Sequence, residues 1–180
     1  MENKIIALEN LCHIENAFEE DGFLNIEGYA AHYNKANLNN EVVDSRSFTR
    51  FFNMYANKEL EPHVNWQHTD TVVGPITEIV SREDGLWISA KLNKGVKIVD
   101  EMIAPNILAG TLNKFSTEGY IYGGYDGIVE NKDGSYYVKD FLLTSVSIVR
   151  TSADPQAVFT VKNFIDEWRE NKKRLKWYLL

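Results

Sequence analysis

The stretch VVGPITEIVSREDGLWISAKL, residues 72–92, points most directly to the fold. Two runs rich in apolar and β-branched residues, at 72–80 and 85–92, flank the polar segment Ser-Arg-Glu-Asp at 81–84. Runs of this kind around a short polar turn predict a β-hairpin. A second hairpin is predicted at residues 11–34, where a polar turn at 19–22 separates two strand-like runs.

Further strand-like runs show the same pattern of short apolar segments between turns. They lie at residues 64–67, 115–122, 136–141 and 142–149. Many short strands with few helices indicate a mainly β (α+β) fold. We expect a compact, β-barrel-like antiparallel sheet with flanking helices.

Three segments have the spacing of amphipathic helices. Residues 47–56 carry an aromatic stripe that we expect in the core, and residues 97–108 form a helix that Pro105 must end or kink. The third segment lies at the C-terminal end of the chain. We therefore expect one domain over residues 1–160 and a C-terminal amphipathic helix over 161–180, which either packs on the domain or forms a tail.

Composition excludes several classes of function. The chain has 180 residues, a formal net charge of −7 and a single cysteine, Cys12. It lacks the basic footprint of a nucleic-acid binder, and one cysteine allows neither an intrachain disulfide nor a multi-cysteine zinc site. No apolar run reaches the length of a membrane span. The sequence predicts a soluble intracellular protein without a metal or cofactor.

Two polar side chains at strand ends are candidates for catalysis. His68 follows the apolar run at 64–67, and Ser116 follows Phe115 at the start of a later strand. A serine is a weak nucleophile until a base takes its proton, so the pair suggests acyl transfer. The order His then Ser excludes the Ser-first order of α/β-hydrolases. Gly119 would permit the close backbone approach that oxyanion donors need, but position alone does not distinguish catalytic from structural roles.

Six segments, taken in order, resemble those of one protein family. They are IEGYAAHYN at 26–34, DSRSF at 44–48, QHTD with VGPI at 67–76, DGLWISAKL at 84–92, GTLNKFS at 110–116 and SVSIV with ADPQA at 145–157. This order is similar to that of the prohead (capsid maturation) proteases of tailed bacteriophages, which are related in fold to the herpesvirus assemblins. The resemblance covers roughly residues 22–160 and implies an assemblin-like fold.

The resemblance also implies roles for individual residues. Ser116 matches the family's nucleophile and His68 its catalytic histidine. The third member is commonly an acid, or a second histidine in the herpesvirus relatives, and its place falls on Ser145. A serine can accept a hydrogen bond from the imidazole but carries no charge. Asp140 and Glu118 are alternatives to Ser145, and Glu118 stands where the family often has glycine.

The function implied by the resemblance is that of a serine endopeptidase of phage capsid maturation. Its expected substrates are the scaffold protein, the major capsid protein and the enzyme itself, inside the assembling procapsid in the host cytoplasm. Neither nucleic acid nor a membrane is expected as a partner, and a homo-oligomer is left open. Because Ser145 is not an acid, the alternative is a catalytically inactive structural component of the virion or procapsid on the same fold.

Overall fold

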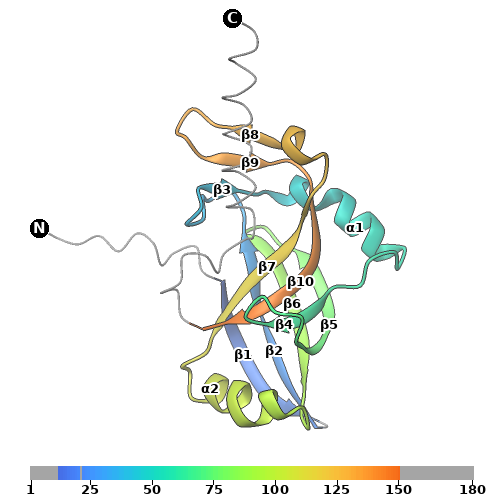
Figure 1. Cartoon of the computed structure of the whole chain (residues 1–180), viewed down its shortest axis with the longest axis vertical. Helices are drawn as coiled ribbons and strands as arrows, with labels where there is room; N and C mark the ends of the chain where they lie inside the picture. Colours follow the sequence, from blue (N-terminus) through green and yellow to red (C-terminus); the bar gives the residue numbers. More distant parts are fainter. Residues whose placement is uncertain (1–11, 21, 151–180) are drawn as a thin grey trace, which may run out of the picture.

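Both predicted hairpins form, and their strands join a closed barrel in the computed structural model, which describes residues 12–20 and 22–150 (Figure 1). The order around the barrel is β1-β2-β6-β5-β4-β10-β7. The mainly β, barrel-like prediction is confirmed. The barrel strands are β1 Cys12–Glu20, β2 Phe23–His32, β4 His63–Trp66, β5 Val72–Ser81, β6 Gly85–Asn93, β7 Lys114–Ile121 and β10 Phe141–Val149.

One pairing differs from the antiparallel sheet that we expected. β10 lies parallel to β4, with Ser145 opposite His63 and Ser147 opposite Asn65. The other pairs of the described barrel are antiparallel. A parallel pair needs a long connection, and here the whole chain from β5 to the strand before β10 provides it. No local sequence pattern predicts a pairing between strands so far apart in the chain.

The predicted aromatic helix forms and covers one side of the core. A 3₁₀ turn, Ser45–Phe48, leads into helix α1, Thr49–Ala56. The Asp44 side chain caps this turn by accepting hydrogen bonds from the backbone N–H groups of its first residues. Phe48 and Phe51 are completely buried, as the spacing of the stripe predicted. The cap therefore fixes where the aromatic face enters the core.

The second predicted helix changes its winding near Pro105. A π-helical turn, Val99–Ile103, is followed by the short helix α2, Ala104–Leu108, with Pro105 in its first turn. Proline has no backbone N–H, so it is tolerated where a helix begins but not within it. The predicted interruption is confirmed. In Figure 1, α2 lies at one end of the barrel.

A small second sheet lies at the opposite end of the molecule from α2 (Figure 1). It has the order β3-β9-β8, with β3 Glu41–Val42, β8 Ile128–Glu130 and β9 Tyr136–Val138. We did not predict β3 or β8. The strand predicted at 136–141 is also wrong in extent, because the chain leaves β9 after Val138 and begins β10 at Phe141. Segments of two or three residues are too short to show an alternating pattern.

The predicted C-terminal helix at 161–180 lies outside the described residues. The boundary proposed at residue 160 therefore stays a prediction. Within residues 12–20 and 22–150, none of the helices has the length and apolar character needed to cross a membrane.

Candidate active site

Neighbouring strands β10 and β7 present polar side chains on one face. In β10, Ser145 and Ser147 alternate with fully buried valine and isoleucine side chains. The register places Ser145 opposite Glu118 and Ser147 opposite Ser116 of β7. Side chains in a strand alternate between its two faces. The same alternation that buries the apolar residues therefore places Ser147 next to the predicted nucleophile and Ser145 next to Glu118.

A β-bulge in β10 sets this register. Leu143 pairs with Gly119, but the next pair is Ser145 with Glu118, so Thr144 is an extra residue. The Thr144 hydroxyl donates a hydrogen bond of 3.3 Å to the backbone carbonyl of Glu118. An extra residue reverses which side chains face which side of the sheet. The bulge thus places Ser145, rather than its neighbour, opposite the Glu118 side chain.

Gly119 is required by the close approach of the two strands beside this bulge. A Cβ atom at this position would lie 2.0 Å from the backbone oxygen of Leu142 and 2.8 Å from the Phe141 ring. We expected Gly119 to allow a close backbone approach, and the approach in the structure is to β10. A side chain here would force β7 away from β10 and displace Glu118, which precedes the glycine.

His68 lies in a tight turn between β4 and β5. Gln67 and His68 have φ angles of 52° and 56°, in the left-handed region that side chains other than glycine seldom adopt. Two hydrogen bonds tie the turn to β10. The Gln67 N–H donates to the Ile148 carbonyl at 3.1 Å, and the His68 N–H donates to Ser147 Oγ at 3.0 Å. The strand that carries the two serines therefore compensates the backbone strain of the turn.

The His68 imidazole meets the Glu118 carboxylate. His68 Nδ1 lies 2.9 Å from Glu118 Oε1, and each side chain is only 16% exposed. The approach is that of an ion pair without the alignment of a straight hydrogen bond. Catalytic contacts are often poorly aligned before substrate binds. Glu118, one of three candidates for the third member, is thus the carboxylate that the fold brings to His68.

Two hydroxyl groups complete the surroundings of this carboxylate. Ser145 Oγ donates to Glu118 Oε2 at 2.6 Å, and Ser147 Oγ donates to the same oxygen at 3.3 Å. Burial favours the neutral acid, but the contact with His68, the two hydroxyl donors and the His68 charge outweigh it and lower the pKa of Glu118 to about 2. The carboxylate is therefore ionised throughout the neutral range.

Ser116 is 3% exposed and lies on the same face of β7 as Glu118, two residues away. Its cross-strand partner is Ser147, whose hydroxyl binds both the His68 backbone and the Glu118 carboxylate. Three segments far apart in the sequence, the His68 turn, β7 and β10, thus meet around one cross-strand pair. Ser145, predicted to orient His68 directly, donates a hydrogen bond to Glu118 instead.

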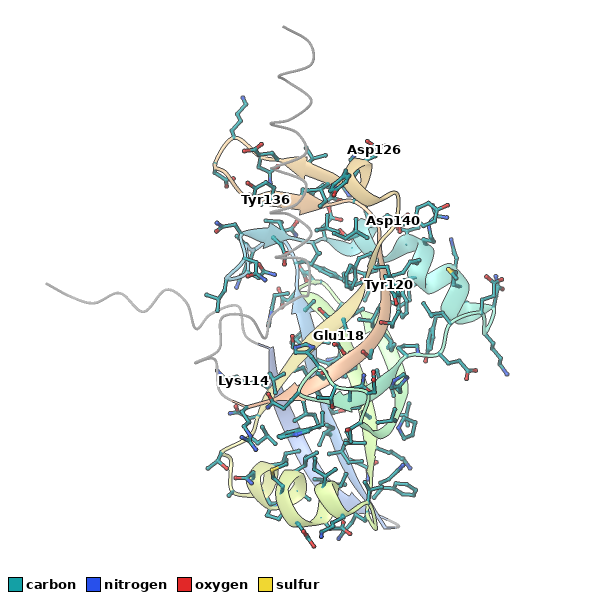
Figure 2. All side chains as sticks on the ribbon, viewed as in Figure 1. Lys114, Glu118, Tyr120, Asp126, Tyr136 and Asp140 are labelled. Carbon is teal, nitrogen blue, oxygen red and sulfur yellow. The ribbon has the colours of Figure 1, made fainter. Side chains whose placement is uncertain are left out.

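Asp140, the other alternative, lies elsewhere. Its backbone carbonyl accepts from Tyr122, beyond the end of β7, and its Oδ2 forms a 2.7 Å ion pair with Arg50 of α1. Figure 2 shows Glu118 near the middle of β7 and Asp140 farther along, toward the small sheet. Asp140 therefore connects α1 to the start of β10 through its ion pair with Arg50.

A serine, an imidazole and an ionised carboxylate on one face of a closed β-barrel are the side-chain set of a serine peptidase. The model of the family described as caudovirus prohead serine protease matches residues 13–171. The chain belongs to this family, and hence to the peptidases of phage capsid maturation.

The fold has a counterpart among solved structures. The bacteriophage T4 capsid assembly protease, gp21, matches with a TM-score of 0.60 and 18% sequence identity, over 79% of this chain and 95% of that chain. At this identity the likeness concerns the fold. No curated protein matches the chain.

Proposed function

We propose that the protein is a serine endopeptidase with Ser116 as nucleophile, His68 as general base and Glu118 as the acid that orients His68. The observation that carries this proposal is the 2.9 Å contact between His68 Nδ1 and the ionised carboxylate of Glu118. It supplies the charge that Ser145, at the family's usual third position, lacks. Ser145 acts on the histidine through Glu118.

The charge of Glu118 decides how the proton moves. An ionised carboxylate beside Nδ1 keeps the proton on that nitrogen, so Nε2 is the basic atom of the neutral ring. Nε2 takes the Ser116 hydroxyl proton as Oγ attacks the peptide carbonyl, and then gives it to the leaving amine. Water hydrolyses the acyl-enzyme with the same residue as base. Backbone N–H groups near residues 116–118 are the proposed oxyanion donors.

We propose the phage scaffold protein, the major capsid protein and the chain itself as substrates, cleaved inside the assembling procapsid. The family assignment supports this class of substrate. The alternative, an inactive structural component, was motivated by the missing acid at Ser145. The position of Glu118 next to His68 removes that motivation and favours the enzyme.

The test is co-expression of the full chain with its scaffold and capsid proteins, followed by mass spectrometry of the products. Ser116→Ala should abolish cleavage, while Ser89→Ala, a serine on β6, should leave it unchanged. An active-site serine probe should label the parent chain and not Ser116→Ala. Cleavage that persists in Ser116→Ala would show that Ser116 is not the nucleophile, and an unlabelled, uncleaving parent chain would favour the structural role.

A further inference from the structure

Lys114 is a buried lysine that the proposed mechanism does not use. It is the first residue of β7, opposite Val149 of β10 and His13 of β1, and only 8% of it is exposed. Figure 2 shows Lys114 at the start of the strand and Glu118 farther along it. Lysine is seldom buried to this extent unless a partner compensates its charge. The surroundings of Lys114 therefore need an explanation.

Lys114 lies on the face of β7 that carries the proposed nucleophile. Side chains alternate along a strand, so Lys114, Ser116 and Glu118 share one face. Phe115, between the first two, lies on the other face and packs in the core of the barrel. Two residues of a strand span about 7 Å, and lysine carries its ammonium on a flexible four-carbon stem. The charge of Lys114 is thus within reach of the space in front of Ser116.

The ammonium of Lys114 has no counter-charge within the described chain. No ion pair or hydrogen bond of residues 12–20 and 22–150 involves its Nζ atom. Nζ is also not among the polar atoms that are fully buried without a partner, so it reaches the surface while the stem is covered. A cation beside apolar walls attracts an anion more strongly than a cation in open water does. A ligand on the Ser116 face therefore has access to this charge.

The ionised carboxylate on the same face is already engaged. Glu118, two residues beyond Ser116, contacts the His68 imidazole. On the other side of Ser116, the cross-strand neighbour of Lys114 is Val149, which is 4% exposed and carries no charge. The face therefore has a compensated anion on one side of Ser116 and an uncompensated cation on the other.

Peptide cleavage produces a negative charge beside these groups. As Ser116 Oγ bonds to the substrate carbonyl carbon, the electron pair of the C=O bond moves to the oxygen, and His68 takes the hydroxyl proton. The oxyanion returns this pair when the C–N bond breaks and the amine leaves with the proton from His68. A fixed positive charge beside the oxyanion lowers the barrier without transferring a proton itself.

We propose that Lys114 binds a negatively charged oxygen of the substrate beside Ser116. Two oxygens have this chemistry: the oxyanion that forms during attack, and a side-chain carboxylate of the substrate next to the scissile bond. The inference rests on the proposed peptidase function. It adds a cationic side chain that none of the steps proposed above contains.

The test compares Lys114→Met and Lys114→Arg with the parent chain. The substrate is a peptide that spans a cleavage site mapped in the co-expression experiment. Methionine keeps most of the stem but removes the charge, and we expect kcat/KM to fall about 10²-fold. Arginine keeps the charge and should restore kcat/KM to within about tenfold of the parent value. Lys91→Met, in a lysine of β6 whose ammonium lies 5.5 Å from the centre of the Phe23 ring, is the matched control and should change nothing.

A second peptide separates the two oxygens. In this peptide, glutamine and asparagine replace every glutamate and aspartate. If Lys114 binds the oxyanion, Lys114→Met lowers kcat by the same factor for both peptides and leaves KM unchanged. If Lys114 binds a side-chain carboxylate, the loss is confined to the acidic peptide, and the parent chain itself cleaves the amide peptide more slowly. Either pattern supports the inference.

Stability distinguishes a functional lysine from a structural one. Removal of an uncompensated charge should leave the midpoint of denaturant unfolding unchanged or higher in Lys114→Met and in Lys114→Gln. Lower midpoints in both variants, or parental kcat/KM for both peptides in Lys114→Met, overturn the inference. Cleavage that depends on Ser116 but not on Lys114 overturns only this inference, whereas a parent chain that cleaves nothing overturns the proposed function as well.

Discussion

Two glutamates show how the surroundings of His68 differ from the small sheet at the end of the molecule. Both Glu118 and Glu41 are withdrawn from water, and burial favours the neutral form of each. Yet the pKa of Glu118 falls to about 2, whereas the pKa of Glu41 rises to about 8. The two carboxyl groups therefore carry different charges at neutral pH within one small protein.

Their neighbours explain the difference. Glu118 faces an imidazole and two hydroxyl donors. Glu41 is 3% exposed, receives a 2.8 Å hydrogen bond from the Asn37 amide, and keeps Oε1 without a hydrogen-bond partner. Desolvation is the largest single contribution to the pKa of both groups, but at Glu118 the contact with His68, the hydroxyl donors and the His68 charge together outweigh it. Burial alone therefore does not determine the charge of a carboxyl group, because the donors and charges around it decide which form is favoured.

The largest effect is expected from Glu118→Gln. An amide keeps the size of the side chain but cannot hold Nδ1 protonated or stabilise the imidazolium that forms during attack. We expect kcat/KM to fall by about 10³- to 10⁴-fold, measured with a cleaved peptide. Glu41→Gln is the matched control and should retain parental activity. Comparable activity in Glu118→Gln and the parent chain would remove Glu118 from the mechanism.

Glu41→Gln should instead change how stability depends on pH. The folded pKa of Glu41, about 8, lies above its ordinary value of 4.5, so unfolding releases a proton between these pH values. The stabilisation is complete below pH 4.5 and is lost as pH rises through 8. Glu41→Gln should remove this loss, which amounts to about 5 kcal/mol at most. Denaturant unfolding at pH 5 and pH 9 measures it, and parallel pH curves for both proteins would contradict the assignment.

Ser145→Ala should have a smaller effect, confined to the surroundings of Glu118. It removes the 2.6 Å donor to Glu118, so the pKa of that carboxyl rises toward its ordinary value. The stabilisation by ionised Glu118 is present above pH 4.5 and is lost as pH falls toward 2, and the variant should lose it at higher pH. We expect a higher midpoint of acid unfolding and about a tenfold lower kcat. Ser89→Ala should shift neither quantity.

The smallest effect is expected from Asp140→Asn. This change breaks the ion pair with Arg50 on α1 but leaves the surroundings of His68 intact. We expect kcat/KM within about twofold of the parent chain, because the contacts of an exposed ion pair contribute little. A loss comparable to that of Glu118→Gln would make Asp140 the catalytic acid.

Local patterns in the sequence were sufficient for the hairpins, the aromatic helix and the interruption at Pro105. Each depends on residues within a few positions of one another, such as the apolar runs around 81–84. The parallel pairing of β4 with β10 was not predictable in this way. The two strands are separated by most of the barrel, and neither contains a signal that selects its partner.

The candidate site was predictable only in part, because one of its residues depends on the pairing of distant strands. The order of segments indicated His68 and Ser116, but the third member depended on a cross-strand register. The bulge at Thr144 places Ser145 opposite Glu118, and no sequence rule locates a bulge of one residue. Glu118 was visible only as a departure from the family's usual glycine.

The left-handed turn at Gln67 and His68 has a consequence for the order in which the enzyme is made. The turn is held by hydrogen bonds to Ser147 and Ile148, which lie in the last described strand. During synthesis His68 precedes these partners by some eighty positions, and Ser116, the proposed nucleophile, precedes them as well. The parts of the site come together only after β10 has left the ribosome and docked between β4 and β7. A nascent chain therefore cannot assemble the proposed site until the last barrel strand has been synthesised and paired.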